Sequence, residues 1–353
     1  MIISYEQERN LTKKLLAARG MSEEDADLVG AVVTHSDFTG VYSHGMSRIT
    51  TYLRQLEKGA LNPRPTLKKT ADNKAAITFD CDNGSGIVSV CQVYDQVLER
   101  AREYGIAIGT GMHSANIGCG AYYGVRASED DVICLVLSNT ITAMAPYGGA
   151  DKLIGTNPIV MSAPALEEYP LVLDMATSGV ALGKVIAYAR EGKEIPLGWA
   201  KDIDGNLTTN AREAHTVLPF GEHKGYGLAV MVDALGAVLA GAEVGSKIGR
   251  WECDEKENTG FVVIVIDPAF FMPIDVFKKS LDAYIRVIKH SRPAVGVKEI
   301  FMPGEIEYRK LEENKKTGIE VPTELAKELC RIATNLGIIS EGEDFEALVA
   351  AVS

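Results

Sequence analysis

Residues 41–56 read VYSHGMSRITTYLRQL and place three functional side chains four residues apart, at His44, Arg48 and Tyr52. On a helix this spacing brings the three side chains to nearly one face. Ser43, directly before them, is a good N-cap candidate for such a helix. One face would then carry a proton donor, a fixed cation and a phenol, a combination that indicates a site rather than a packed core.

Five further stretches of polar or glycine-rich residues stand at predicted strand or helix ends. They are GMHSANIGCGAYYG (111–124), SNTITAMAPYGG (138–149), IGTNP (154–158), LDMATSGVALGK (173–184) and PFGEHKGYG (219–227). A tight loop would explain any one of them, but together they favour a cleft. In the last stretch Lys224 falls in the first turn of a predicted helix, where the dipole disfavours a cation unless it meets an anion.

Signatures of several other kinds of site are missing from the sequence. The nearest approaches to the G-x-G-x-x-G dinucleotide fingerprint, at Gly84 and Gly109, lack the third glycine, which argues against a conventional Rossmann site. The sequence has no HExxH motif, no grouping of histidines with cysteines and no G-x-S-x-G elbow. We therefore expect no metal ligands.

Composition narrows the class of protein. The chain has 353 residues, of which 46% are hydrophobic and 24% charged, and a formal charge of -12. This acidic balance argues against a nucleic-acid partner, which would need a basic face. The scattered cysteines read as reduced thiols, no signal peptide is recognisable, and no apolar stretch reaches the ~20 residues of a membrane span. We expect a cytoplasmic protein that does not bind membranes.

Periodicity predicts helices at both ends of the chain around a middle rich in strands. Helices are expected at residues 4–19, 22–37, 43–59, 88–105 and 224–241, and again from residue 274 onward, with one near Glu312 and the last at residues 323–336. Short strands are expected at residues 75–80, 106–111, 131–138, 158–164, 171–176 and 260–267. The 224–241 helix is so apolar that we expect it to be buried.

The expected fold class is α/β in the sense of a mixed α+β protein. Residues 1–72 would form the helical N-terminal part of a terminal domain, and residues 73–270 a central domain. Residues 271–353 would form a C-terminal helical part that packs back on the N-terminal one.

Taken in order, SHGMSRI, GTNP, DMATS with GK shortly after, HKGYGLA and the late MPGE resemble the second malate/L-lactate dehydrogenase family. The resemblance runs from about residue 5 to 340. It implies an NAD(P)-dependent oxidoreductase that interconverts a small 2-oxo acid and a 2-hydroxy acid. It also implies a non-Rossmann fold, in which the central mixed-sheet domain binds NAD or NADP; of the two cofactors we expect NAD. The protein would be a homodimer with active sites at the subunit interface.

The same resemblance assigns roles to residues of this sequence. His44 becomes an acid/base candidate, Arg48 would hold the substrate carboxylate, and Ser43 and Tyr52 would line the substrate pocket. A guanidinium pairs with a carboxylate through two parallel hydrogen bonds, and a histidine near neutral pKa suits a proton transfer. The residues implied to contact the cofactor are Ser138, Asn157, Asp174, Met175, Ala176, Ser178, Lys224, Gly304 and Glu305.

One position departs from the family, whose pattern NSxHFG carries a histidine after a strand. An ungapped comparison puts Asn116 at that histidine, whereas a gap brings in His113, and both stay catalytic candidates. Asparagine donates hydrogen bonds but relays no proton at neutral pH. Three hypotheses follow: a 2-oxo acid reductase whose proton comes from His44 or His113, a cyclic-imine reductase, and a non-catalytic protein that binds a dinucleotide and an acid. We favour the first hypothesis and the ungapped comparison.

Overall fold

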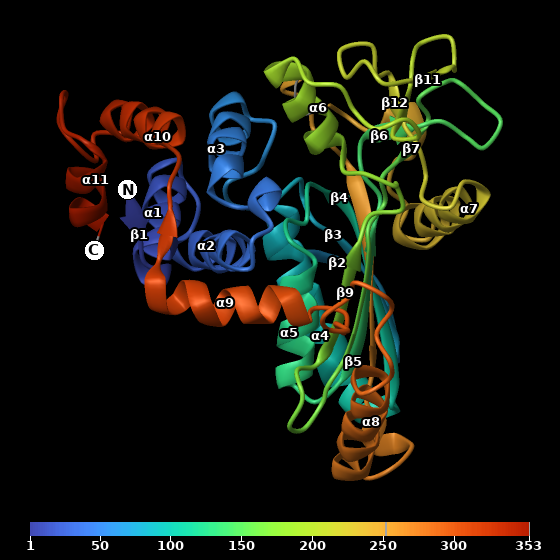
Figure 1. The fold of residues 1–353 in the computed structure, drawn as a ribbon. Helices are drawn as coiled ribbons and strands as arrows, with labels where there is room; N and C mark the ends of the chain where they lie inside the picture. The colour runs from blue at the N-terminus through green and yellow to red at the C-terminus, as the bar shows by residue number, and fades with distance from the viewer. Residues whose placement is uncertain (251–252, 353) are drawn as a thin grey trace.

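The computed structural model describes residues 1–250 and 253–352 and has a mixed α and β structure (Figure 1). The expected fold class is confirmed at this level. The α-helices are α1 (Tyr5–Ala18), α2 (Glu23–Phe38), α3 (Ile49–Lys58), α4 (Gly86–Tyr104), α5 (Ala121–Glu129), α6 (Leu182–Glu191), α7 (His223–Val232), α8 (Ile274–Lys289), α9 (Glu305–Thr317), α10 (Thr323–Asn335) and α11 (Phe345–Val352). None of the described helices combines the length and the apolar composition that crossing a bilayer requires.

Helices from the two chain ends pack together, at the left of Figure 1. The strand β1 (Ile2–Ile3) runs antiparallel to β14 (Ile319–Glu320). Apolar side chains of α1 share one core with those of α10 and α11, among them Leu11, Leu15, Leu16, Leu329, Phe345 and Leu348. Because this core joins residues more than three hundred positions apart in the chain, the first helices are held in place by the last ones.

Two serines cap the first two helices, which begin where the sequence predicts them. Ser4 accepts a hydrogen bond from the Gln7 amide, and the Gln7 side chain accepts one from the Ser4 amide, which completes a capping box. Ser22 accepts a hydrogen bond from the Asp25 amide at the start of α2. These bonds satisfy amides that a helix leaves unpaired at its N-terminus.

The centre of the molecule is a seven-stranded sheet in the order β2-β3-β4-β13-β5-β8-β9. β3 and β4 are parallel, and the remaining neighbours are antiparallel. Such a sheet differs from the parallel sheet of a Rossmann domain, as the missing fingerprint indicates. Its strands are β2 (Lys68–Asn73), β3 (Ala76–Asp80), β4 (Ile106–Ser114), β5 (Ile133–Ser138), β8 (Ile159–Ala163), β9 (Leu171–Met175) and β13 (Thr259–Ile266).

α4 and α5 cover one face of this sheet, the face turned towards the terminal helices (Figure 1). The close approach of α4 depends on Gly109 in β4. A Cβ atom there would lie 2.4 Å from a methyl of Val97 and 2.7 Å from one of Val93, so a larger residue would push the helix off the sheet.

α7 and the π-helical turn that follows it, Asp233–Val238, cover part of the opposite face. The prediction that this apolar helix is buried is wrong for the side turned away from the sheet. Met231 is 54% exposed, Val238 63% and Leu239 55%. An apolar sequence indicates that a helix favours apolar contacts, but it does not show how many sides are covered. In this chain the sheet covers only one side of the helix.

A smaller five-stranded sheet in the order β11-β10-β12-β6-β7 lies beside α6 (Figure 1). Its own core includes Ala143, Ile154, Val185 and Val217. These strands were not predicted, because strands so short leave little alternation of apolar and polar residues to detect. They are β6 (Thr142–Met144), β7 (Ile154–Gly155), β10 (Ala200–Lys201), β11 (Leu207–Thr208) and β12 (Thr216–Val217).

The structure differs from the expected segment limits in two places. β2 pairs with β3, so the central sheet takes in residues 68–73, and the expected limit at residue 72 crosses a strand. α8 lies at the far end of the central sheet rather than on the N-terminal helices (Figure 1). There Asp282 accepts hydrogen bonds from the amides of Leu166 and Glu167, which fixes α8 to the β8–β9 connection.

Candidate active site

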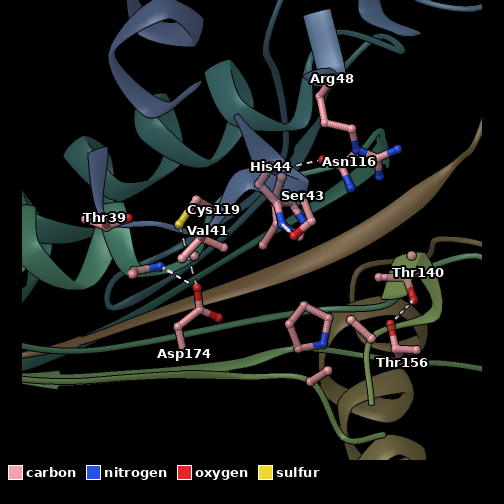
Figure 2. Close-up of a pocket in the computed structure, with 18 of the residues that line it drawn as sticks. Thr39, Val41, Ser43, His44, Arg48, Asn116, Cys119, Thr140, Thr156 and Asp174 are labelled. Carbon is pink, nitrogen blue, oxygen red and sulfur yellow. Dashed lines mark hydrogen bonds between the residues drawn. The ribbon is translucent and has the colours of Figure 1, made fainter. Parts of the chain in front are cut away.

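A cavity of about 1040 Å³ opens between the terminal helices, the ends of the central strands and α6. Ligand pockets commonly measure ~300–1,000 Å³, so this one is large enough for a cofactor together with a small substrate. It brings together most of the predicted site residues: Ser43, His44, Arg48, Asn116, Ser138, Asp174, Met175, Ala176 and Gly304. Figure 2 shows Ser43, His44, Arg48 and Asn116 gathered on one side and Asp174 on the other.

The segment with His44 and Arg48 is not the continuous helix expected from residue 43. Two 3-10 turns, Tyr42–His44 and Met46–Arg48, precede α3, and Gly45 between them is extended. The Asp37 carboxylate interrupts the helix because it accepts a hydrogen bond from the Met46 amide at 2.6 Å. Ser43 caps no helix.

His44 and Arg48 nevertheless face the same cavity. Burial, helped by the positive charge of Arg48, lowers the pKa of His44 to about 4. His44 is therefore neutral at neutral pH and able to accept a proton. The Ser43 hydroxyl lies 3.1 Å from Nδ1 of His44, so it can fix one ring nitrogen while the other serves a ligand.

Tyr52, on α3, is buried behind the cavity and acts on Asn116. Its hydroxyl donates to Oδ1 of Asn116 at 3.0 Å, and the Gly118 amide donates to the same oxygen at 2.9 Å. Burial raises the pKa of Tyr52 to about 12, so the phenol keeps its proton. With the Asn116 oxygen occupied, its amino group is the part able to donate to a ligand.

His113 does not line the cavity. The sequence analysis puts it in a loop, but it lies near the end of β4, with an exposed side chain whose Nδ1 is 2.9 Å from Oδ1 of Asp80. Its backbone has φ +50°, a conformation that redirects the chain towards Asn116. Of the two candidates for the family histidine position, Asn116 is the one that reaches the cavity.

The opposite side of the cavity is built from strand ends and helix N-termini. Asp174 ends β9 with Met175, and its Oδ2 accepts a hydrogen bond from the Ala121 amide at the start of α5, at 2.8 Å. Burial raises the pKa of the Asp174 carboxyl. Gly304 has φ +86°, and a Cβ atom there would lie 2.9 Å from the Val172 carbonyl oxygen, so no larger residue fits.

Four residues implied to contact the cofactor lie outside this cavity. Asn157 is fully buried, accepts from the Thr140 amide and donates to the Ala229 carbonyl, so it links a loop to α7. The Ser178 hydroxyl donates to the Val180 carbonyl. Buried Glu305 pairs with Lys289 and Arg309, and Lys224 is exposed at the start of α7.

Several cavity residues were not anticipated from the sequence. Glu257 is buried, faces the cavity, and accepts a hydrogen bond from the Gln55 side chain at 3.1 Å. Its position directly before the apolar strand β13 is a signal that sequence reading could have used. Arg190 and Glu307, from α6 and α9, also line the cavity, but nothing in their sequence surroundings distinguishes them from ordinary surface charges.

The donors around the cavity suit a dinucleotide. Ala181, Leu182 and Gly183 line it at the start of α6, and no side chain caps this helix. A Cβ atom at Gly183 would meet nothing within 4 Å, so the first turn of α6 is open. This places the positive end of α6 at the space, an arrangement that favours a phosphate group, whereas the Ala121 amide at the start of α5 already donates to Asp174. Within the described residues, no three His, Cys, Asp or Glu side chains are grouped to hold a metal ion.

Comparisons with known proteins give these observations a family. The chain matches the malate/L-lactate dehydrogenase family over residues 3–330. It is 37% identical to the L-sulfolactate dehydrogenase of Methanocaldococcus jannaschii over 96% of this chain and 98% of that protein. The solved structure of the sulfolactate dehydrogenase from that organism has a TM-score of 0.90, covering 98% of this chain and 99% of the other at 36% identity.

Two further relatives widen the range of named activities. The malate dehydrogenase of Pyrococcus horikoshii is 34% identical over 92% of both chains. The structure of the delta1-piperideine-2-carboxylate reductase of Pseudomonas syringae has a TM-score of 0.86 at 29% identity, covering 94% of this chain and all of the other. The resemblance seen in the sequence motifs is therefore confirmed. The chain is a dehydrogenase that belongs to the malate/L-lactate dehydrogenase family.

Proposed function

We propose that the protein interconverts a small 2-oxo acid and a 2-hydroxy acid by hydride transfer with a nicotinamide dinucleotide. The observation that carries this proposal is the meeting of His44, Arg48 and Asn116 in one cavity whose other walls are strand ends and helix N-termini. The names of the relatives, sulfolactate dehydrogenase and malate dehydrogenase, support a substrate of this class.

In the proposed reaction, Arg48 binds the substrate carboxylate and so orients the neighbouring carbon. During oxidation neutral His44 accepts the hydroxyl proton, and during reduction it returns a proton to that oxygen. Asn116, held by Tyr52, donates a hydrogen bond to the same oxygen. A nicotinamide held in the cavity would supply the hydride for reduction or accept it during oxidation. A carboxylate on Arg48 offsets the charge that lowers the pKa of His44, which brings His44 closer to the protonated form that reduction requires.

The central sheet and its helix ends would hold the cofactor. Ser138, Asp174, Met175, Ala176 and Gly304 line the cavity there and stay our candidates for cofactor contacts. We propose NAD rather than NADP, because a carboxylate beside the adenosine ribose would accept a hydrogen bond from its 2′-hydroxyl but would repel a 2′-phosphate. The carboxylates that line the cavity belong to Asp174, Glu257, Glu307, Glu324 and Glu328.

We also propose that the protein works as a homodimer. The outward side of α7 and the π-helical turn expose Leu228, Met231, Val238 and Leu239, and a second copy of the chain is the partner that would bury them. Lys224 stands at the N-terminus of this helix and would lie near the interface. The six free cysteines suit a reducing compartment, so we place the enzyme in the cytoplasm.

Absorbance of NADH and NADPH, followed with a panel of 2-oxo acids, tests the activity. Steady oxidation of NADH with at least one small 2-oxo acid is the expected result. Tight NADH binding without turnover across the panel would instead favour a non-catalytic binder. Sedimentation of the wild type and of the Met231→Glu variant tests the dimer, since a buried charge there should shift the protein towards monomers.

A cyclic-imine reductase is the second candidate. It is favoured by Asn116 at the family histidine position and by the likeness to the solved piperideine-carboxylate reductase. A cyclic imino acid also carries one carboxylate for Arg48, and its nitrogen makes a smaller demand for a proton relay near Asn116. Including cyclic imines in the same panel separates the two candidates by their kcat/KM values.

A further inference from the structure

Two carboxyl groups, those of Glu8 and Asp37, are buried behind the turn that carries His44 and Arg48. Glu8 lies on α1 and is 0% exposed, and Asp37 lies near the end of α2 and is 6% exposed. Buried carboxylates are costly unless they are paired with a cation or accept hydrogen bonds. Neither has a place in the reaction proposed above, so their burial calls for a physical reason.

Asp37 holds the turn directly. One oxygen, Oδ2, accepts the Met46 amide at 2.6 Å, while the other, Oδ1, lies so close to Gly45 that a Cβ atom there would be 1.7 Å away. The preceding residue, Ser36, donates its hydroxyl to the Val41 carbonyl at 2.7 Å. The end of α2 therefore grips the chain on both sides of His44.

Glu8 supports Asp37 when its own carboxyl group is protonated. No donor in the described part of the chain reaches either oxygen of Glu8, and its neighbour is the Asp37 carboxyl. Two carboxyl groups bond to each other when one of them is protonated. Burial and the Asp37 charge raise the pKa of Glu8 well above its ordinary value, whereas burial raises that of Asp37 to about 6. Near neutral pH the pair keeps one proton on Glu8, and Asp37 is the charged acceptor.

We propose that Glu8 and Asp37 are positioning residues that fix His44 and Arg48 in the cavity through a shared proton. The Glu8 hydroxyl orients the Asp37 carboxylate, which in turn holds the Met46 amide and packs on Gly45. Loss of that proton leaves two like charges in a buried place, and the turn must move to relieve them. This inference rests on the roles proposed for His44 and Arg48.

Cations on the neighbouring elements do not neutralise the pair. The shifts of both pKa values arise from burial, from the two groups themselves and from the Met46 amide, with no contribution from a cation among the described residues. The charged and titratable groups on the elements packed around it are Arg9, bonded to Asp27, Lys310 beside Gly40, Lys315 over the Tyr5 ring, buried His35, and His44 and Arg48 themselves.

The pH profile of kcat/KM for four variants tests the proposal. Glu8→Gln keeps a donor to Asp37 at every pH, so its kcat/KM at pH 7 should stay within about twofold of wild type, and it should lack the alkaline decline of kcat/KM that loss of the Glu8 proton causes in the wild type. Glu6→Gln, exposed on the same helix, is the matched control. Asp37→Ala should lower kcat/KM about 10- to 100-fold, mainly in kcat, and Asp37→Asn should recover part of it.

Hydrogen exchange in the wild-type protein provides a readout that needs neither a variant nor a substrate. The peptide containing the Met46 amide should lose protection as Glu8 ionises on the alkaline side, beyond the intrinsic rise in exchange. In Glu8→Gln it should stay protected. Identical alkaline declines in the wild type and Glu8→Gln, or constant protection of the Met46 peptide, would overturn the proposal. An enzyme inactive on every tested acid would overturn the proposed function, while exchange would still decide the positioning role.

Discussion

The two sides of the cavity are built in different ways. The side with His44 and Arg48 presents long side chains from two short 3-10 turns, which hydrogen bonds tie to α2. The side with Asp174 presents strand ends and the first turns of α5 and α6, where the hydrogen-bond donors are mostly backbone amides. One side therefore depends on the identity of a few residues, and the other depends on the sheet and its helices.

Because of this difference, substitutions on the two sides of the cavity should change different kinetic parameters. A side chain that performs chemistry can be removed by one change, which should lower kcat or kcat/KM sharply. A backbone amide survives any substitution that preserves the fold, so changes on the cofactor side should be smaller and should appear in the KM for the dinucleotide.

Arg48→Ala should reduce kcat/KM for the acid substrate by about 10³-fold, because it removes both the carboxylate partner and its orientation. Most of the loss should appear as a higher KM for the acid, with the KM for NADH nearly unchanged. Arg54→Ala, which removes an exposed ion pair with Asp254 from the same helix, is the control. Near-native rates for Arg48→Ala would mean that the substrate binds elsewhere.

His44→Gln should lower kcat by about 10²-fold, the usual scale for an acid or base in proton transfer. Exposed His290→Gln is the control and should change little. NMR titration of His44 in the free protein should give a midpoint near pH 4, and Arg48→Ala should move it upward, since the Arg48 charge lowers this pKa. A midpoint that stays the same in Arg48→Ala would mean that the Arg48 charge does not act on His44.

Asn116→Ala and His113→Ala should be measured side by side. Asn116→Ala should lower kcat/KM about tenfold, because one hydrogen bond to the reacting oxygen is lost. His113→Ala should stay within about twofold of the wild type, since this side chain bonds to Asp80 outside the cavity. The reverse order would show that the cavity rearranges on binding and brings His113 to the substrate.

Glu307→Gln should change cofactor preference in favour of NADP by a few-fold, roughly three- to tenfold, because one of several carboxylates in the cavity loses its charge. The ratio of the kcat/KM values for NADPH and NADH measures this. Glu313→Gln, exposed on the same helix, is the control. An unchanged ratio would mean that the adenosine ribose lies away from Glu307.

Much of this arrangement could be predicted from the sequence because apolar periodicity and serine caps are local signals. The first two helices, expected to begin at residues 4 and 22, and the inner strands follow from them. The break of the third helix could not be predicted, since it depends on Asp37, a residue that is nine positions earlier and looks like an ordinary helix residue. In the same way, the sequence could not show that the motif residues Lys224 and Glu305 lie outside the cavity, because their positions depend on packing with distant parts of the chain.

The placement of β13 has a consequence for how the protein is made. This strand lies between β4 and β5 in the sheet, although about 120 residues separate it from β5 along the chain. During synthesis β4 and β5 lack their shared neighbour until residues 259–266 have left the ribosome. β1 lacks its partner β14 for even longer. Folding dominated by such distant pairings is slow, so the facing edges of β4 and β5 should stay unpaired while roughly the next 120 residues are made.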